Sequence, residues 1–323
     1  MKILFHGENA RAFRPGLESR LEGDHDIVTV DDGLTGPGAV EHFVSADVIV
    51  GIRLGPAMPR PDRLRLYQMP GAGTDGIDRA CLPPGAVLCN CFGHEASIAE
   101  YVMAALLARH VPLADADRRL RRGDWRYWAG TPASVRTELG AQTVGLLGFG
   151  RIGKAIAERA RAFGMGVTAA NRGPIAASPP VDRAFGLDEL PAFMGSADAI
   201  VVSLPLADDT TSLVDAAALA AMRPDAVIVN VGRGPVIDEG ALYEALKARR
   251  IAGAIIDTWY RYPQADDPSP LPSALPFHEL DTVVMTPHMS GWTQGTIARR
   301  QAVIAANIDN LAASRPLVNV VAR

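Results

Sequence analysis

One short segment constrains the fold of this chain more than any other: a glycine-rich loop that directly follows an apolar run. The run covers residues 144–147, and the glycines follow in the spacing G-x-G-x-x-G, at Gly148, Gly150 and Gly153. After a buried strand, the first glycine permits a tight turn and the second lets a pyrophosphate approach the backbone. The third lets the next helix pack on the strand, with its N-terminus facing the phosphate charge. The segment therefore predicts a dinucleotide-binding domain.

The apolar runs along the rest of the chain predict parallel sheets with helices between the strands. From residue 144 onward the runs are apolar at consecutive positions, which is typical of strands buried on both faces. Helical patterns over 153–163 and 239–249 lie between such runs, and this alternation predicts a doubly wound α/β fold. At 323 residues the chain has room for about two domains. The predicted strands are 2–5, 26–30, 47–51, 144–147, 167–170, 199–203, 227–230, 254–257 and 283–286.

Two long helical patterns are placed to carry the chain between these domains. The first runs from Ser97 to about His110, and Ser97 with Glu100 has the spacing of a capping box that would begin the helix. The second has apolar residues at helical spacing over 297–311. We therefore expect a discontinuous domain of residues 1–96 and 289–323, with the dinucleotide domain of residues 97–288 inserted in it.

Composition narrows the class of protein. The formal net charge is −4, whereas nucleic-acid-binding proteins usually carry a net basic face. Cys81, Cys89 and Cys91 form no CxxC pair, which argues against a disulfide framework and a structural zinc. The first apolar run has only three residues, too few for a signal peptide, and no stretch approaches the ~18 apolar residues of a membrane span. We expect a cytoplasmic protein that binds no metal, nucleic acid or membrane.

The residues after the run 167–170 bear on the choice of cofactor. An acid at this point would grip the ribose hydroxyls of NAD, but the chain has Asn171 and Arg172. Asn171 is neutral and would not repel a 2′-phosphate, and Arg172 can bind one through charge-assisted hydrogen bonds. This pattern favours NADP(H). The alternative is that Arg172 stacks on the adenine or faces solvent, and NAD still binds.

Taken together, these motifs make the chain resemble the D-isomer-specific 2-hydroxyacid dehydrogenases, a family that includes phosphoglycerate dehydrogenase and the glyoxylate/hydroxypyruvate reductases. The resemblance runs from about Arg53 to Thr293. It implies a Rossmann domain inserted in a discontinuous, flavodoxin-like substrate domain, and an NAD(P)-dependent oxidoreductase acting on a D-2-hydroxy acid or 2-oxo acid. The segments that carry it are PGAGTDGID (70–78), SIAEYV (97–102), TVGLLGFGRIGKAIA (143–157), VSLPL (202–206), VNVGRGPVIDEGAL (229–242), GAIIDTW (253–259) and TPHMSG (286–291).

Two residues of these segments suit the chemistry of such an enzyme. Arg233 follows the predicted strand 227–230, where a ligand crevice opens in such sheets, and its guanidinium can grip a carboxylate and polarise a carbonyl. His288 follows the strand 283–286, and an imidazole can exchange a proton with a hydroxyl near neutral pH. The resemblance implies that Arg233 and His288 are the catalytic residues.

The resemblance also implies contacts to the substrate and the cofactor. For the substrate these are Arg53, Ala72, Gly73 and His94, although Arg53 is equally ordinary as a solvent-exposed residue. Trp292 either walls the pocket or packs between domains, and Asp257 either contacts the nicotinamide amide or caps a helix. For the cofactor the implied contacts are Gly148, Gly150, Arg151, Ile152, Gly153, Asn171, Arg172, Leu204, Pro205, Val231, Gly232, Asp257, His288 and Gly291.

The chain departs from the family at the partner of the histidine. The family usually has a glutamate five residues after the aspartate, and that position is Tyr262 here. Without a carboxylate the imidazolium is less favoured, although a phenol can still hydrogen-bond the ring. A competing arrangement has Asp266 or Asp267 folding back to His288. Formate dehydrogenases also lack the glutamate, so a formate- or phosphonate-dehydrogenase-like enzyme remains an alternative.

A non-catalytic, nucleotide-sensing regulator of the same fold is a further alternative, because similar corepressors use this fold to bind partners. The acidic balance of charges and the absence of a basic tail argue against it. The segment 120–128 is rich in arginine and aromatic residues, including Trp125 and Trp128, which is typical of an interface. We expect a homodimer that acts on a small-molecule substrate. Packing of this segment on its own chain is the alternative.

Overall fold

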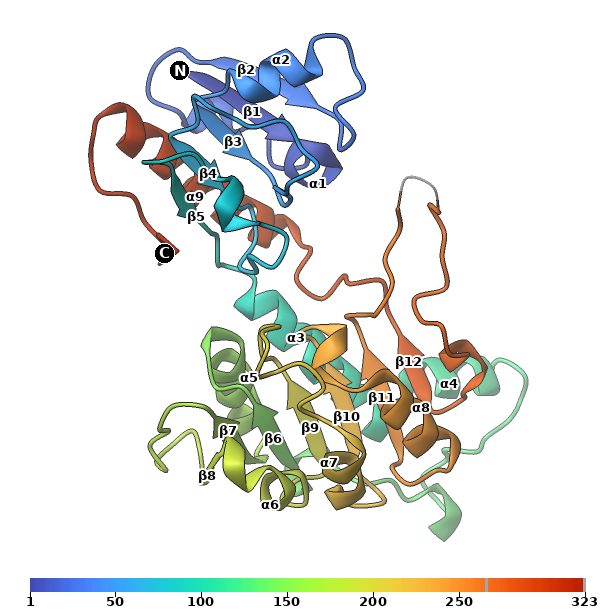
Figure 1. The fold of residues 1–323 in the computed structure, drawn as a ribbon. Helices are drawn as coiled ribbons and strands as arrows, with labels where there is room; N and C mark the ends of the chain where they lie inside the picture. Colours follow the sequence, from blue (N-terminus) through green and yellow to red (C-terminus); the bar gives the residue numbers. More distant parts are fainter. Residues whose placement is uncertain (265–266, 322–323) are drawn as a thin grey trace. The chain divides into compact units, whose positions relative to one another are not determined.

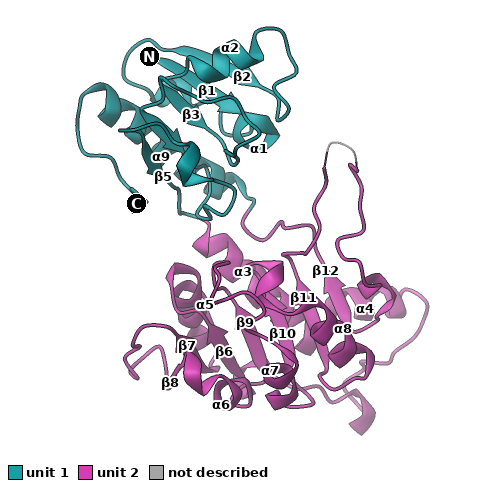
Figure 2. Cartoon of the chain, in the orientation of Figure 1, with its two compact units in different colours: residues 1–93, 292–323 teal, residues 94–291 magenta. Residues whose placement is uncertain are grey.

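The computed structural model describes residues 1–264 and 267–321, and the chain forms two compact units. One unit consists of residues 1–93 and 292–323, and the other of residues 94–291 (Figure 2). The predicted α/β class with two parallel sheets is confirmed. No helix of the described residues is long and apolar enough to cross a membrane.

The boundaries between the units lie three residues from those expected, at 93/94 and 291/292 instead of 96/97 and 288/289. At the first boundary, the Ile98 amide donates to the His94 carbonyl, so the helix of the larger unit begins there. At the second, the amides of Met289 and Ser290 donate to Asp257 and hold this stretch on the larger unit.

The smaller unit is a five-stranded parallel sheet with helices on both faces (Figure 1). Its strands are β1 (Lys2–His6), β2 (Asp26–Val30), β3 (Val48–Val50), β4 (Leu66–Gln68) and β5 (Val87–Cys89). Their order, β2-β1-β3-β4-β5, is the flavodoxin-like order. Apolar residues of α1 (Gly7–Arg11) and α9 (Gln294–Ala312) cover one face, and those of α2 (Ala39–Val44) cover the other.

The larger unit is a seven-stranded parallel sheet in the order β12-β11-β10-β9-β6-β7-β8. From β8 to β11 this is the Rossmann order 3-2-1-4-5-6, and β12 extends it. The strands are β6 (Thr143–Leu147), β7 (Gly166–Asn171), β8 (Arg183–Gly186), β9 (Ala199–Val202), β10 (Val227–Asn230), β11 (Gly253–Ile256) and β12 (Val283–Met285). The strand order reverses between β6 and β9, which is the point where a dinucleotide crevice opens in this fold.

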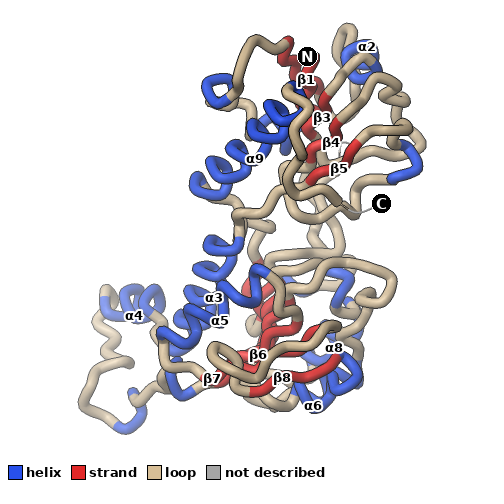
Figure 3. The backbone as a smooth tube through the Cα atoms, turned by 90° about the vertical axis from the view of Figure 1, so that its left-hand side faces the viewer, coloured by secondary structure: helices blue, strands red, loops and turns tan. Residues whose placement is uncertain are grey.

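Helices cover both faces of this larger sheet. One face is covered by the helices α3 (Glu95–His110) and α5 (Arg151–Ala162). The other face is covered by α6 (Leu190–Met194), α7 (Ala216–Ala221) and α8 (Glu239–Lys247). The helix α4 (Leu113–Leu120) and the chain after it stand out from the unit as an arm (Figure 3).

Several local predictions are wrong in detail. The helix α3 begins at Glu95, so Ser97 lies inside its first turn and is buried, and the capping box expected at Ser97 does not begin the helix. The helix α5 begins at Arg151, two residues before the predicted start. Strands β4, β5 and β8 were not predicted, although the equally short strands β3 and β12 were, so strand length alone does not decide which strands a sequence reveals.

Candidate active site

The predicted cofactor and catalytic residues of the larger unit lie along one edge of its sheet. Because all seven strands are parallel, their carboxyl ends meet at this edge. Along it, the order is His288 after β12, Asp257 after β11, Arg233 after β10, Leu204 and Pro205 after β9, Gly148 to Gly153 after β6, and Asn171 with Arg172 at the end of β7. Strands are ~4.8 Å apart, so β12 and β7 are separated by about 24 Å.

The glycine-rich loop has the geometry that a bound pyrophosphate requires. Gly148 has φ of +100°, a conformation that favours glycine. A Cβ at Gly153 would lie 2.3 Å from the Gly148 carbonyl oxygen, so only glycine lets α5 approach the loop this closely. A Cβ at Gly150 would have no atom within 4 Å, so the space beside it is open. Gly150 precedes the first turn of α5, where Arg151 and Ile152 begin the helix. These residues fit a dinucleotide.

At the β7 end of this edge, Arg172 forms an ion pair with Asp209, which lies in the loop after β9. Both side chains are mostly exposed, Arg172 by 67% and Asp209 by 58%. Asn171 is the last residue of β7. Asp209 has no signal in the sequence, because a residue 37 positions away gives no local sign of such a contact.

The turn that carries Arg233 is held by the side chain of Asn230. The Asn230 amide nitrogen donates to the Arg233 carbonyl (3.0 Å), and its oxygen accepts from the Gly232 amide (3.1 Å). A Cβ at Gly232 would lie 2.6 Å from the Leu204 carbonyl oxygen, and one at Gly234 2.3 Å from a backbone oxygen of the 257–262 segment. The turn is therefore closely packed and Arg233, which is half-buried, projects from a fixed backbone.

Asp257 is fully buried and binds the turn that contains His288. Its Oδ1 accepts from the Met289 amide (2.9 Å) and its Oδ2 from the Ser290 amide (3.0 Å). Oδ1 also accepts from the Thr286 hydroxyl at 2.6 Å. The carboxylate thus caps a turn after β12 and not a helix, so the helix-cap alternative is wrong. Its bonds also stabilise the backbone of His288, which has φ of +58°.

A third residue, Tyr101 of α3, completes a directed chain of hydrogen bonds to Asp257. The Tyr101 and Thr286 hydroxyl oxygens are 2.7 Å apart. Because Thr286 gives its proton to a carboxylate, it must accept the proton of Tyr101. Burial raises the pKa of Tyr101, so its phenol stays protonated and can donate. This role of Tyr101 has no signal in the sequence, because an aromatic residue on an apolar helix face is ordinarily part of the core.

The imidazole of His288 is hydrogen-bonded to Tyr262, the residue that the sequence predicts in place of the family glutamate. The Tyr262 hydroxyl lies 2.9 Å from Nδ1 of His288, and it accepts a hydrogen bond from the Trp259 amide at 3.0 Å. A backbone amide only donates, so the phenol can give its own proton to Nδ1. In the neutral ring that bond leaves the proton on Nε2. In the imidazolium, Nδ1 donates to the phenol oxygen instead.

The competing arrangement would place Asp266 or Asp267 beside His288. Asp266 lies outside the described residues. The backbone of Asp267 exchanges two hydrogen bonds with the backbone of Gln264, and the residue is exposed.

Trp259 adds a second support to the turn that contains His288, because its indole Nε1 donates to the Thr286 carbonyl at 2.8 Å.

The remaining predicted substrate residues lie in the smaller unit, except for His94, the N-cap residue of α3 in the larger unit. Arg53 is exposed, and the buried Tyr67 hydroxyl donates to its carbonyl at 2.7 Å. The Asn90 side chain donates to the Ala72 carbonyl at 2.8 Å, which anchors the loop of Ala72 and Gly73.

Two residues beside the unit boundary have different surroundings. Trp292 packs edge-on against Phe13 within the smaller unit, with 44% of its surface exposed. At Gly291 a Cβ would come 3.4 Å from the Cβ of His94, so the two stretches of chain that lead out of the larger unit run close together.

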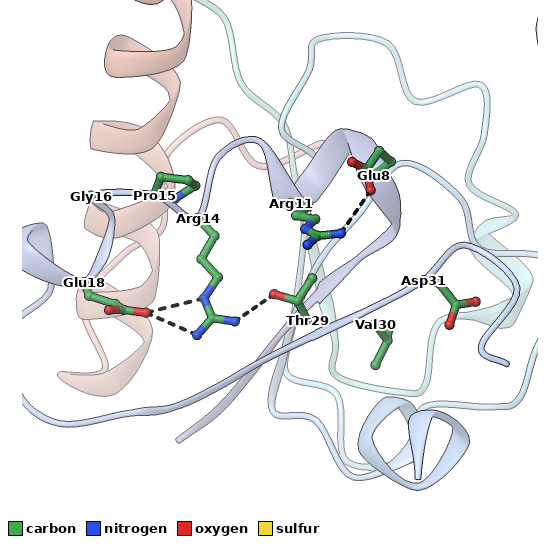
Figure 4. A pocket seen from close by; sticks show the side chains of 9 residues that line it. All are labelled: Glu8, Arg11, Arg14, Pro15, Gly16, Glu18, Thr29, Val30 and Asp31. Atoms are coloured by element: carbon green, nitrogen blue, oxygen red, sulfur yellow. Dashed lines mark hydrogen bonds and ion pairs between the residues drawn. The ribbon is translucent and has the colours of Figure 1, made fainter. Parts of the chain in front are cut away.

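A pocket of about 430 Å³ in the smaller unit contains none of the predicted site residues (Figure 4). Its arginines are paired within the pocket: Arg14 binds Glu18 and the Thr29 hydroxyl, and Arg11 binds Glu8. Both arginines are therefore already bound to carboxylates, Asp31 adds a further negative charge to the lining, and we assign the pocket no ligand.

The arm of the larger unit has an ordered base and an apolar exposed surface. At the base, Asp115 accepts hydrogen bonds from Arg119, Tyr127 and Arg118, which hold the pKa of its carboxyl well below the usual range. A groove of about 540 Å³ lies between the arm and the ends of α3 and α5. The exposed apolar side chains on or beside the arm are Val111, Leu113, Leu120, Trp125, Trp128 and Val135.

Comparison with known proteins points to one family. The family model for the NAD binding domain of the D-isomer specific 2-hydroxyacid dehydrogenases matches residues 103–290. The chain is 32% identical to the D-3-phosphoglycerate dehydrogenase of Methanocaldococcus jannaschii over 91% of this chain and 55% of that protein. The chain spans about half the length of the curated D-3-phosphoglycerate dehydrogenases it matches.

Solved structures of similar fold extend over nearly the whole chain. An NADPH-dependent glyoxylate/hydroxypyruvate reductase from Sinorhizobium meliloti, in complex with NADP and malonate, superposes with a TM-score of 0.78 at 26% identity, covering 99% of this chain and 96% of that one. An acyclic imino acid reductase in complex with NADPH and D-Arg superposes with a TM-score of 0.79 at 26% identity, covering 100% of both chains.

Proposed function

The chain belongs to the D-isomer-specific 2-hydroxyacid dehydrogenase family, and on this basis we propose that it is an NADP(H)-dependent oxidoreductase that interconverts a small 2-oxo acid and its D-2-hydroxy acid. The observation that carries the proposal is the placement of Arg233, Asp257 and His288 after three adjacent strands, β10, β11 and β12. The glycine-rich loop that fits a dinucleotide follows β6 at the same edge of the sheet. A carboxylate-binding arginine and a proton-exchanging histidine are the groups that this reaction needs.

Arg233 binds the substrate carboxylate and polarises the adjacent carbonyl. Its turn is held by Asn230 and by two glycines that admit no side chain, so the guanidinium starts from a fixed backbone. Preorganised charge of this kind is effective because little reorganisation is needed during the reaction. We propose further substrate contacts from His94 and from Arg53, Ala72 and Gly73 of the smaller unit.

His288 exchanges the proton. When bound, the nicotinamide supplies the hydride that C2 of the 2-oxo acid accepts. In reduction, protonated Nε2 of His288 gives its proton to the forming alkoxide, and in oxidation neutral Nε2 takes it back. Tyr262 and Asp257 position the imidazole, the first at Nδ1 and the second through the backbone of the turn. Asp257 accepts three hydrogen bonds within the chain, which leaves one lone pair on Oδ2 that would accept from the nicotinamide amide.

The cofactor would lie along the sheet edge, with its pyrophosphate at the glycine-rich loop. Gly148, Gly150 and the first turn of α5 hold the pyrophosphate, and Leu204, Pro205, Val231, Gly232 and Gly291 line the rest of the edge. Asn171 and Arg172 stand at the β7 end, where the ribose 2′-position is read in this fold. The positive charge of Arg172 and the absence of an acid at Asn171 favour NADP(H) over NAD(H).

The experiment that tests the proposal is a panel of 2-oxo acids assayed with NADPH and with NADH. Turnover of glyoxylate, hydroxypyruvate or phenylpyruvate, faster with NADPH, is the expected result. Oxidation of formate or phosphonate in the same assays would favour the alternative of a formate- or phosphonate-dehydrogenase-like enzyme. Cofactor binding without turnover of any of these compounds would instead indicate a nucleotide-sensing regulator.

A second candidate function is reduction of an imino acid, and the contact between Tyr262 and His288 favours it. An iminium ion already carries its proton, so the amine forms without a proton from the enzyme, and a neutral partner for His288 suffices. The resemblance to an acyclic imino acid reductase supports this candidate. Adding ammonia or an amine to the 2-oxo acid assays tests it, since amine-dependent consumption of NADPH with an amino acid product is required.

We also propose that the protein is a homodimer joined through its arm. Trp125 and Trp128 are 65% and 57% exposed, and aromatic residues with arginine are enriched at protein interfaces. The Trp128 ring packs against Gly130 of the same arm but still leaves more than half of its surface exposed, and the groove at the base of the arm offers a surface for a second copy.

A further inference from the structure

The ion pair between Arg172 and Asp209 joins the two strands that flank the glycine-rich loop. Arg172 follows β7 and Asp209 follows β9, while β6 lies between these two strands in the sheet. The strand β6 leads directly into Gly148, and the Ser203 hydroxyl donates to the Gly148 carbonyl at 3.1 Å. The loop that carries Asp209 is therefore adjacent to the part of the edge where the adenosine half of a dinucleotide belongs.

The loop that carries Asp209 is held in place by hydrogen bonds of its own threonine side chains. The next residue, Thr210, is 1% exposed, and its hydroxyl donates to the Pro205 carbonyl at 2.7 Å. The same hydroxyl accepts from the Ala207 amide at 2.8 Å, and the Thr211 hydroxyl donates to the Ala207 carbonyl at 2.9 Å. The backbone beside Asp209 is thus fixed, whereas Arg172 reaches it through a long and mostly exposed side chain.

We propose that Asp209 is a specificity-determining residue that competes with the 2′-phosphate of NADP(H) for Arg172. This inference rests on the proposed preference for NADP(H). A 2′-phosphate must take over the guanidinium that Asp209 holds, and it then stands close to a like charge. NAD(H) has an uncharged hydroxyl at this position, so the ion pair stays intact when it binds. Asp209 consequently narrows the difference in affinity between the two cofactors.

The test is the isosteric variant Asp209→Asn, with Asp208→Asn as the matched control. Asp208 is the neighbouring carboxylate, and in the described part of the chain it forms no ion pair with Arg172. Dissociation constants for NADPH and NADH are measured by titration calorimetry without substrate. In Asp209→Asn the dissociation constant for NADPH should fall about three- to tenfold at low salt, which means tighter binding, as expected when one exposed negative charge near a phosphate is removed. NADH binding should change less than about twofold, and the gain should shrink in 0.5 M salt because exposed charges are screened.

Two outcomes overturn the inference. One is unchanged or weaker NADPH binding in Asp209→Asn, and the other is an equal gain in Asp208→Asn, which would make the effect one of general charge. The variant Arg172→Ala separates this failure from that of the proposed function. If Arg172→Ala weakens NADPH binding selectively while Asp209→Asn has no effect, the cofactor preference stands and the inference fails. If Arg172→Ala weakens both cofactors equally, the preference for NADP(H) itself is wrong.

Discussion

Replacing Tyr262 with glutamate should move the basic limb of the reduction profile to higher pH. In the proposed mechanism reduction requires protonated His288, so the rate should fall as the pH rises and the imidazolium loses its proton. The Tyr262 oxygen lies 2.9 Å from Nδ1, and a glutamate that reaches the same point would place a negative charge beside the ring. Opposite charges at this range favour the charged form of a histidine.

The size of the shift follows from the exposure of the site. Two unit charges about 4 Å apart attract by about 1 kcal/mol in water and by about 4 kcal/mol at an effective dielectric constant of 20. Tyr262 is 37% exposed, which places the site nearer to the aqueous limit. At 1.36 kcal/mol per unit, the basic limb should move up by about one pH unit. The acidic limb of the oxidation profile should move by the same amount, because both limbs report the same group.

The assay is kcat/KM for a 2-oxo acid measured from pH 5 to pH 10, with Tyr262→Phe as the control. The phenylalanine variant removes the hydrogen bond without adding charge, so its limb should move little. If Asp266 or Asp267 were the true partner of His288, changing that residue to asparagine would move the basic limb to lower pH. Tyr262→Glu would then leave the basic limb unchanged. A basic limb that stays in place in all four variants would refute both accounts.

Three further predictions follow from the site and the arm. Arg233→Ala should reduce kcat/KM by about 10²–10³, because one group both binds the substrate and stabilises developing charge, and a loss below tenfold in a folded variant would remove Arg233 from catalysis. Arg172→Ala should raise KM for NADPH and leave KM for NADH nearly unchanged, and a wild-type enzyme that binds NADH more tightly would contradict the cofactor assignment. Light scattering at micromolar concentration should give the mass of a dimer, and a monomer mass would reject the interface proposed at Trp125 and Trp128.

The parts of the fold that the sequence predicts are those set by local spacing. The loop from Gly148 to Gly153 is an example, because its function depends on where side chains are missing within six consecutive residues. The buried strands are another example, since runs of consecutive apolar residues predict them. Strand β4 was missed although β3, of the same length, was predicted, and Ser97 shows that a motif of correct spacing can lie inside a helix that starts earlier.

The contacts that orient the site could not be predicted, because they join residues far apart in the chain. Tyr101 meets Thr286 across 185 positions, and Asp257 meets Ser290 across 33. Neither pair has a local signature, since each depends on which strands the fold makes neighbours. The sequence did locate Tyr262 at the glutamate position, because that spacing lies within one motif. The structure adds that its hydroxyl meets Nδ1 and is itself held by Trp259.

The substitution at Tyr262 separates two roles that a glutamate would combine. A carboxylate beside Nδ1 both orients the imidazole and stabilises its positive charge. The phenol, fixed by the Trp259 amide, provides orientation and carries no charge near neutral pH, because its ordinary pKa is ~10. Orientation therefore comes from Tyr262 and from the turn that Asp257 binds, and the neutral phenol itself adds no charge that would stabilise the imidazolium. A substrate that demands little proton donation at high pH, or that already carries its proton as an iminium ion does, is the kind that such a site serves best.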